Sequence, residues 1–215
     1  MCIRDRITTV EPKFIPKEAM DVVLGEDVKV KLRLIDCVGF LVPDALGNME
    51  NEKERMVKTP WFEEAVPFRQ AAEVGTKRVI SEHSTIGILV TTDGSIGEIP
   101  RENYLGAEER TVTELKQQGK PYLILLNTVK PYGEEAVKLS QEISKKYQAD
   151  CIPVNCDQLR KDDIIKILEH ILYEFPVRQV EFYIPKWVEL LPLSNPLKKQ
   201  LVEKVKEMTG QIQYI

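Results

Sequence analysis

Residues 28–39 read VKVKLRLIDCVG, a strand pattern of alternating apolar and basic residues that runs into Asp-x-x-Gly. A strand that ends in this motif is typical of the Mg²⁺-side loop of P-loop nucleotide hydrolases. There Asp36 would hold the metal through water, and the amide of Gly39 would approach a γ-phosphate. The phosphate loop that accompanies it, G-x-x-x-x-G-K-[ST], does not occur in the 215 residues. The sequence therefore predicts half of a nucleotide site.

The Asp-x-x-Gly motif is short enough to occur by chance, and a second copy spans residues 44–47. Only the copy at Asp36 follows a predicted strand. Open α/β sheets bind their ligands at the carboxyl ends of strands. This context favours a functional aspartate at position 36 over a plain turn residue, which is the alternative.

Hydrophobic residues make up 43% of the chain and charged residues 30%, a composition typical of a folded domain with a core. The net charge of −4 offers no electrostatic support for nucleic-acid binding. No run reaches the ~18 apolar residues of a membrane span. Four cysteines without a Cys-x-x-Cys pair and only two histidines argue against a zinc site. The cysteines are better explained as small buried thiols, as expected in a reducing cytoplasm.

The order of strand and helix patterns predicts the fold class. Met20–Leu24 and Val28–Ile35 form a predicted hairpin, joined by a short turn that contains a glycine. Nearly continuous apolar runs indicate parallel strands covered on both faces, over Ile86–Thr92, Tyr122–Asn127 and Cys151–Val154. Helical patterns separate these runs, over Phe62–Glu82, Ala107–Gln118, Glu134–Tyr147 and Asp162–Phe175. Together they predict a three-layer α/β domain whose sheet is mostly parallel, with an antiparallel edge hairpin.

The chain divides into three parts on sequence grounds. Residues 1–6 are unlike the rest of the chain, and we interpret them as a non-native leader, with a short terminus as the alternative. Residues 7–176 form the predicted α/β domain, truncated at its amino end. Residues 177–215 are the expected start of a following domain, itself cut short. They carry a predicted strand over 177–184 and an amphipathic helix over 194–208.

Asn127 ends a predicted strand in Leu-Leu-Asn-Thr-Val-Lys, where GTPases read guanine with Asn-Lys-x-Asp. Lys130 stands in place of that aspartate, and a lysine cannot accept hydrogen bonds from guanine. Guanine selectivity should therefore be lost, and adenine is the natural alternative. An ordinary asparagine at a strand end is the other interpretation of Asn127.

Several further residues have both a functional and a plain interpretation. Thr8 and Thr9 precede the hairpin, where a P-loop switch carries the threonine that reaches Mg²⁺ and the γ-phosphate. Local sequence alone favours two residues of an extended segment. Residues 91–94, TTDG, either border the site or form a simple β-turn, which we favour. His83 and His170 have no nucleophile or metal partner in the sequence, and we assign neither a catalytic role.

Several long strings of the sequence closely resemble the stage IV sporulation protein A family. They are TTVEPKF at 8–14, LIDCVGF at 34–40, TPWFEE at 59–64, EHSTIG at 82–87, TTDG at 91–94 and YEFPV at 173–177. The similarity runs from about residue 7 to residue 187 and beyond. These strings are far more specific than a single phosphate-loop motif, although the chain spans less than half of the usual length of the family.

The resemblance implies a cytoplasmic ATPase of endospore-forming bacteria, with a fold like that of the translation-factor GTPases. ATP and Mg²⁺ are the implied cofactors. The implied partners are copies of the protein itself in an irreversible polymer, a small amphipathic membrane-bound sporulation protein and other spore-coat proteins. The implied location is the mother-cell side of the outer forespore membrane, where the polymer forms the basement layer of the spore coat.

Carried over by position, the resemblance makes Asp36 the Mg²⁺-side aspartate and Thr8 or Thr9 the sensor of the γ-phosphate. Asn127 matches a degenerate base-recognition asparagine. The lysine and the serine or threonine of the phosphate loop have no counterpart, so we expect this chain by itself to be inactive. The alternatives are a regulatory GTPase of the same superfamily and an interaction scaffold that hydrolyses nothing.

Overall fold

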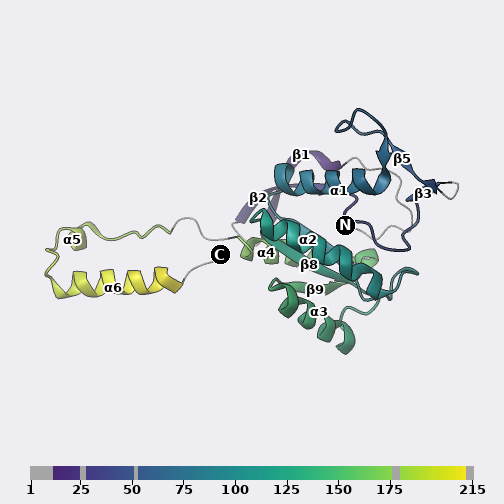
Figure 1. Ribbon diagram of the computed structural model, residues 1–215. Coiled ribbons are helices and arrows are strands. Elements are labelled where there is room, and N and C mark those ends of the chain that lie inside the picture. The colour runs from purple at the N-terminus through teal and green to yellow at the C-terminus, as the bar shows by residue number, and fades with distance from the viewer. Residues whose placement is uncertain (1–11, 25–27, 51–52, 176–179, 212–215) are drawn as a thin grey trace. The chain divides into compact units, whose positions relative to one another are not determined.

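The structure is a computed structural model that describes residues 12–24, 28–50, 53–175 and 180–211 (Figure 1). The chain divides into two compact units, residues 1–171 and 172–215, and each is treated by itself. The first unit holds all of the described strands. Across the described ranges, no helix combines the length and the apolar composition needed to cross a bilayer.

A three-stranded parallel sheet forms the centre of the first unit (Figure 1). Its middle strand, β8 (Tyr122–Asn127), pairs with β7 (Gly87–Thr92) on one side and with β9 (Cys151–Val154) on the other. All six residues of β8 are buried. The three strands occur where the apolar runs predict them, which confirms that these segments are parallel strands.

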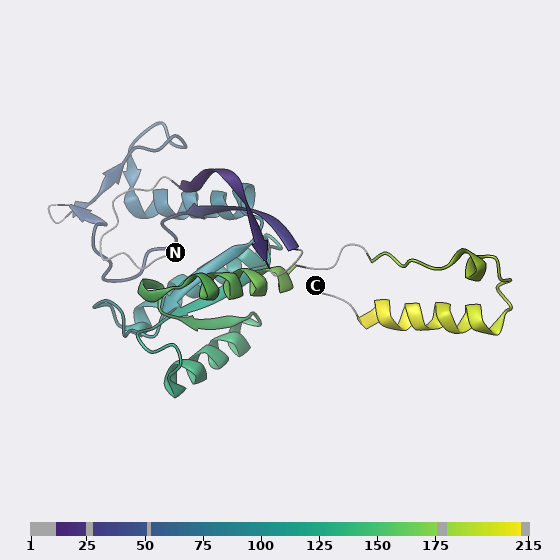
Figure 2. The ribbon, with the colours of Figure 1, turned by 180° about the vertical axis from the view of Figure 1, so that it is seen from behind.

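Helices cover both faces of this sheet. They are α2 (Leu105–Gln117), α3 (Glu134–Tyr147) and α4 (Lys161–Tyr173). Val112 and Leu115 of α2 join Ile143 and Tyr147 of α3 in one core cluster with β8. Figures 1 and 2, which are opposite views, place α2 and α4 on opposite faces. The predicted three-layer arrangement is therefore confirmed.

Among the described strands, β9 forms one edge of the parallel sheet. Backbone carbonyls of Asp150 and Val154 accept hydrogen bonds from Ile124 and Thr128, respectively. Backbone N–H and C=O groups alternate in direction along a strand. The backbone groups of Cys151 and Pro153 therefore point away from β8. Pro153, which has no N–H, thus occupies a position on the outer edge of the sheet.

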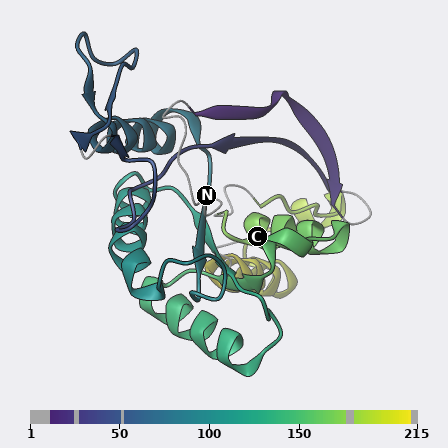
Figure 3. The same cartoon turned by 90° about the vertical axis from the view of Figure 1, so that its right-hand side faces the viewer.

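Antiparallel strands β1 (Lys13–Leu24) and β2 (Val28–Asp36) form the predicted hairpin. β1 begins seven residues earlier than Met20, and its register shifts between Ile15 and Met20. Within the described part of the chain the hairpin is a two-stranded sheet of its own, set apart from the parallel sheet (Figure 3). The prediction that it forms an edge of that sheet is not met, because no described strand connects the two.

Residues between β2 and the first helix form two small antiparallel pairs that the sequence did not predict. They are β3 (Met49–Glu50) with β4 (Lys53–Glu54), and β5 (Met56–Val57) with β6 (Val66–Pro67). Helix α1 (Phe68–Arg78) follows and continues as a π-helical turn, η1 (Val79–His83). The predicted helix over Phe62–Glu82 therefore begins six residues too early. Of the residues just before Phe68, Val66 and Pro67 pair as a strand instead.

The second unit contains two helices, α5 (Lys186–Glu189) and α6 (Pro196–Gln211). The ammonium of Lys198 donates to the carbonyls of Glu189 and Leu191, and these bonds tie the start of α6 to the end of α5. The predicted amphipathic helix is confirmed, displaced by two to three residues. The predicted strand over 177–184 is wrong for residues 180–184, which have no strand partner in the described chain. Residues 176–179 lie outside the described ranges.

Replacing Leu126 by alanine should lower the free energy of unfolding by about 2–5 kcal/mol, because the side chain is wholly buried in the central strand. Val129→Ala is the matched control, since Val129 follows the same strand and is 52% exposed. Urea unfolding followed by circular dichroism measures both. Equal losses for the two variants would show that β8 is not the centre of the core.

Candidate functional site

Asp36 is the last residue of β2 and pairs in register with Lys13 of β1. The chain leaves the strand there and turns at Gly39, whose φ of 78° lies in the left-handed region that favours glycine. Val38 and Leu41 then pack against the buried face of α1. The loop of the Asp-x-x-Gly motif thus follows a strand end, as the sequence predicts for the Asp36 copy, and it also packs against a helix.

Cys37 lies inside this loop with its thiol against α1. Burial raises the pKa of Cys37, although a hydrogen bond with the backbone of Gly39 opposes that increase. A thiol in this setting stays protonated and unreactive at neutral pH. Cys37 therefore supports the packing of the loop.

Three strand ends meet at the carboxyl edge of the parallel sheet, because Thr92, Asn127 and Val154 are aligned in register. Asn127 is buried, and its side-chain oxygen accepts a hydrogen bond from the backbone N–H of Cys156 at 2.9 Å. Cys156 opens the 3-10 turn η3 (Cys156–Gln158). Asn127 thus ties β8 to the loop after β9, and its role in base recognition stays a prediction.

Asp93 follows β7 at the same edge. Its carboxylate accepts hydrogen bonds from the Ser95 amide at 2.9 Å and the Thr128 hydroxyl at 2.5 Å. Partial burial would raise the pKa of Asp93, but these hydrogen bonds outweigh it and hold the pKa below its usual value. The Ser95 hydroxyl in turn accepts from the amide of Val129. An ionised carboxylate therefore joins the loops that follow β7 and β8, which is more than the simple turn that we favoured from the sequence.

Arg101 and Glu108 form a buried ion pair behind this edge, and the sequence analysis missed it. Arg101 begins the 3-10 turn η2 (Arg101–Tyr104), and Glu108 lies in α2 with a side chain that is 3% exposed. Both carboxylate oxygens of Glu108 bond the guanidinium, one at 2.9 Å, and the hydroxyl of Thr91 joins both partners. A glutamate at a core-facing position of a helix was the signal that could have revealed the pair.

The other predicted site residues are not brought into this arrangement. Thr8 and Thr9 lie outside the described residues. Over the part of the chain that is described, no group of three or more His, Cys, Asp or Glu side chains could hold a metal ion. Asp36 alone still suits Mg²⁺ bound through water, since this ion keeps several waters and takes only one or two carboxylates.

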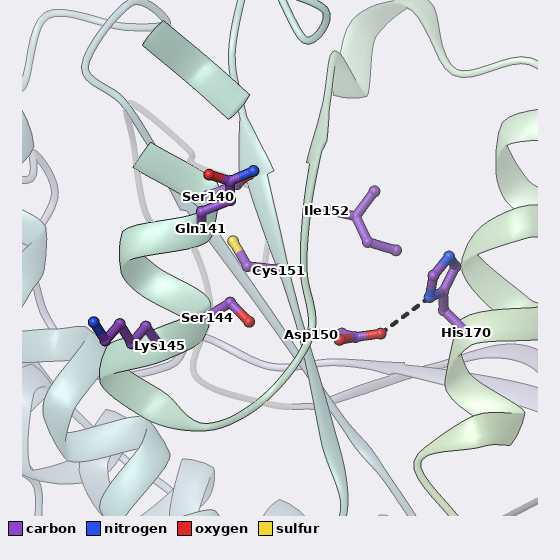
Figure 4. A pocket seen from close by; sticks show the side chains of 8 residues that line it. All are labelled: Ser140, Gln141, Ser144, Lys145, Asp150, Cys151, Ile152 and His170. Atoms are coloured by element: carbon purple, nitrogen blue, oxygen red, sulfur yellow. Dashed lines mark hydrogen bonds and ion pairs between the residues drawn. The ribbon is translucent and has the colours of Figure 1, made fainter. Parts of the chain in front are cut away.

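A surface pocket of about 380 Å³ lies at the other end of β9 (Figure 4). Asp150 and Cys151 at the amino end of β9 line it, together with α3 residues and His170 of α4. Nδ1 of His170 lies 3.1 Å from a carboxylate oxygen of Asp150. This pocket is therefore separate from the carboxyl edge where Asn127 and Asp93 lie.

The parallel sheet between helices, with polar loops gathered at its carboxyl edge, defines an α/β domain of the class that binds ligands at that edge. Residues 3–176 match the family model of the stage IV sporulation protein A ATPase domain. The chain belongs to this family.

Proteins named stage IV sporulation protein A are similar to the chain over nearly all of its length. Identity is 45% with that of Bacillus anthracis and 44% with that of Bacillus subtilis (strain 168), each over 206 residues, which are 96% of this chain and 42% of the relative. The Clostridioides difficile (strain 630) protein is 43% identical over 201 residues. The chain thus spans about two fifths of the length of these relatives, which makes it similar to part of a sporulation protein with an ATPase domain. No solved structure matches it.

Replacing Arg101 by methionine should lower the free energy of unfolding by about 3–5 kcal/mol, because it leaves the Glu108 carboxylate buried without its ion-pair partner. The double variant Arg101→Met/Glu108→Met should recover most of that loss, since no unpaired charge remains. Urea unfolding measures both. A double variant no more stable than the single one would show that charge burial is not the cause.

Cys151 should resist alkylation at neutral pH, because burial, with a smaller contribution from the charge of Glu108, raises its pKa to about 12. A raised pKa keeps the thiol protonated, so the rate with iodoacetamide should climb about tenfold for each pH unit from 7 to 10 without levelling. Peptide mapping by mass spectrometry follows this cysteine alone. A rate that levels below pH 9 would contradict the burial of the thiol.

Proposed function

We propose that this chain is the ATPase domain of an ATP-hydrolysing scaffold protein that assembles with copies of itself, and that the chain lacks the first strand and phosphate loop of that domain. The observation that carries the proposal is Asp36 at the carboxyl end of β2, followed by Gly39 in a left-handed conformation. Family membership supports ATP as the nucleotide. The domain would cover residues 7–176, with residues 177–215 as the start of a following domain.

The proposed fold is that of P-loop nucleotide hydrolases of the translation-factor type. Two strand edges support it: among the described strands, β2 pairs only with β1, and β7 pairs only with β8. One face of the hairpin is also poorly covered, since Ile15, Met20 and Leu34 are 54%, 53% and 49% exposed. A strand between β2 and β7 would unite the hairpin with the parallel sheet. The phosphate loop after such a strand would lie beside the loop of Asp36.

Each candidate residue then has a distinct task. Asp36 would hold water ligands of Mg²⁺, and the Gly39 amide would donate to the γ-phosphate. Thr8 or Thr9 would register whether that phosphate is present. Asn127 would shape the base site through its bond to Cys156. Mg²⁺ bound with ATP supplies the charge neutralisation that phosphoryl transfer requires.

The biological role that we propose follows the family. Hydrolysis would bias a conformational equilibrium toward a polymerising form, which requires contacts that differ between nucleotide states. The polymer would form the basement layer of the spore coat around the forespore. It would lie in the mother-cell cytoplasm on the outer forespore membrane, bound to a small amphipathic membrane protein and to other coat proteins. Support comes from relatives named for stage IV of sporulation.

A regulatory GTPase is the second candidate function. Lys130 is exposed and stands where a guanine-reading aspartate would be, so this candidate has less support than an ATPase. Competition of GTP with ATP for the active protein separates the two. An interaction scaffold without catalysis is the third candidate, and assembly that proceeds equally well without nucleotide would favour it.

The 215-residue chain should hydrolyse ATP no faster than background, because its sequence has no phosphate loop to hold the β- and γ-phosphates. Release of inorganic phosphate with and without Mg²⁺ measures this. A Mg²⁺-dependent rate that Asp36→Ala abolishes would overturn the proposal that a phosphate loop outside this sequence is needed.

Sequencing the genomic DNA upstream of the codon for Ile7 tests whether the missing phosphate loop is encoded there. We expect an in-frame strand followed by G-x-x-x-x-G-K-[ST], and a longer chain made from it should hydrolyse ATP. In that longer chain Asp36→Ala should lower kcat by about a hundredfold or more. Asp21→Asn is the control, an exposed carboxylate of the same hairpin. Upstream DNA without such a loop would favour the scaffold instead.

A further inference from the structure

The segment after the Asp36 loop is held against η2. Val42 and Ala45 bury their side chains with Tyr104 of η2, and each of the three is at most 8% exposed. The amide of Ala45 donates to the carbonyl of Val42 at 3.2 Å and closes a turn. Asp44 in that turn has a φ of 64°, a left-handed conformation that an aspartate adopts only at some cost in energy. A contact from outside the turn would help to hold this conformation.

Asn103 of η2 provides that contact. Its side-chain amide donates to a carboxylate oxygen of Asp44 at 2.7 Å and lies 3.5 Å from the carbonyl of Pro43. The contact joins residues 59 positions apart in the sequence. This bond lies at an exposed position and adds to the packing of Val42 and Ala45 against Tyr104 in holding the turn.

The turn η2 is itself anchored to the parallel sheet. Arg101, two residues before Asn103, bonds the hydroxyl of Thr91 at 3.1 Å and the carboxylate of Glu108. Thr91 precedes the carboxyl end of β7, where Asp93 lies. One short 3-10 turn therefore carries two anchors, one to the sheet edge and one to the segment that begins at Asp36.

We infer that Asn103 is a positioning residue for Asp36, which it holds in place through Asp44 while Arg101 fixes η2 to the sheet. The segment 36–45 is then restrained at two places, by α1 through Val38 and Leu41 and by η2 through Asp44. The importance of this restraint for catalysis rests on the proposed metal role of Asp36. The restraint itself is a property of the folded chain and is measured without nucleotide.

Cys37 reports on the restraint, because it lies next to Asp36 and its side chain is only partly exposed. Opening of the loop should expose this thiol further and speed its alkylation. Asn103→Asp places two carboxylates against each other and should release the segment. In the 215-residue chain it should raise the alkylation rate of Cys37 by roughly three- to tenfold, the effect of losing one exposed hydrogen bond of ordinary strength. The rate at Cys151 should not change.

The swapped double variant Asp44→Asn/Asn103→Asp restores one donor and one carboxylate, and asparagine tolerates the left-handed conformation at position 44. It should return the Cys37 rate to that of the original chain, which a loss of general stability would not do. Glu102→Gln, an exposed neighbour on the same turn, should have no effect. Iodoacetamide labelling with peptide mapping gives the rate at each cysteine separately.

Three outcomes would overturn the inference. They are an unchanged Cys37 rate in Asn103→Asp, a double variant that labels as fast as that single variant, and rates at Cys37 and Cys151 that rise together. None of these outcomes bears on whether the protein hydrolyses ATP, because no nucleotide is present. Conversely, absence of ATP hydrolysis in a longer chain would leave the labelling result intact.

Discussion

The burial of β8 on both faces is the constraint on which the rest of the first unit depends. A strand with all six residues buried can exist only if its backbone pairs on both sides and helices cover both faces. Parallel pairing with β7 and β9 brings the ends of the three strands together at one edge. The loops that leave this edge carry Asp93, Asn127 and Cys156, which hydrogen bonds connect to their neighbours. The candidate site is thus a consequence of how the core is covered.

Strong periodicity made much of this fold predictable from the sequence. The bounds of β8 and α3 agree with the prediction to the residue. A buried apolar run and a helical apolar stripe each extend over enough residues to give a clear pattern. The pairs formed by β3 to β6 have two residues in each strand, too few to show any period. The opposite error occurred over residues 180–184, where alternation suggested a strand that pairs with nothing in the described chain.

The parts of the candidate site that belong to a sequence motif were predictable. The parts that depend on contacts between residues distant in the sequence were not. Asp36 and Gly39 were found because the motif sits at a strand end, and the φ of Gly39 explains why glycine is there. The role of Asp93 depends on Thr128, which lies 35 residues away, so its local sequence indicated only a turn. The pair of Arg101 and Glu108 was missed for a different reason. The two residues are seven apart, but only tertiary burial distinguishes them from surface charges.

The proline on the outer edge of β9 limits how copies of this domain can join. An exposed strand edge invites a strand of another molecule, and continuous sheets between molecules are the common route to fibres. Pro153 offers no donor at that edge, so a neighbouring chain cannot complete a regular ladder there. The self-assembly proposed above would therefore have to use surfaces other than the outer edge of β9. Under that proposal, copies of the domain would not join into a regular continuous sheet along β9.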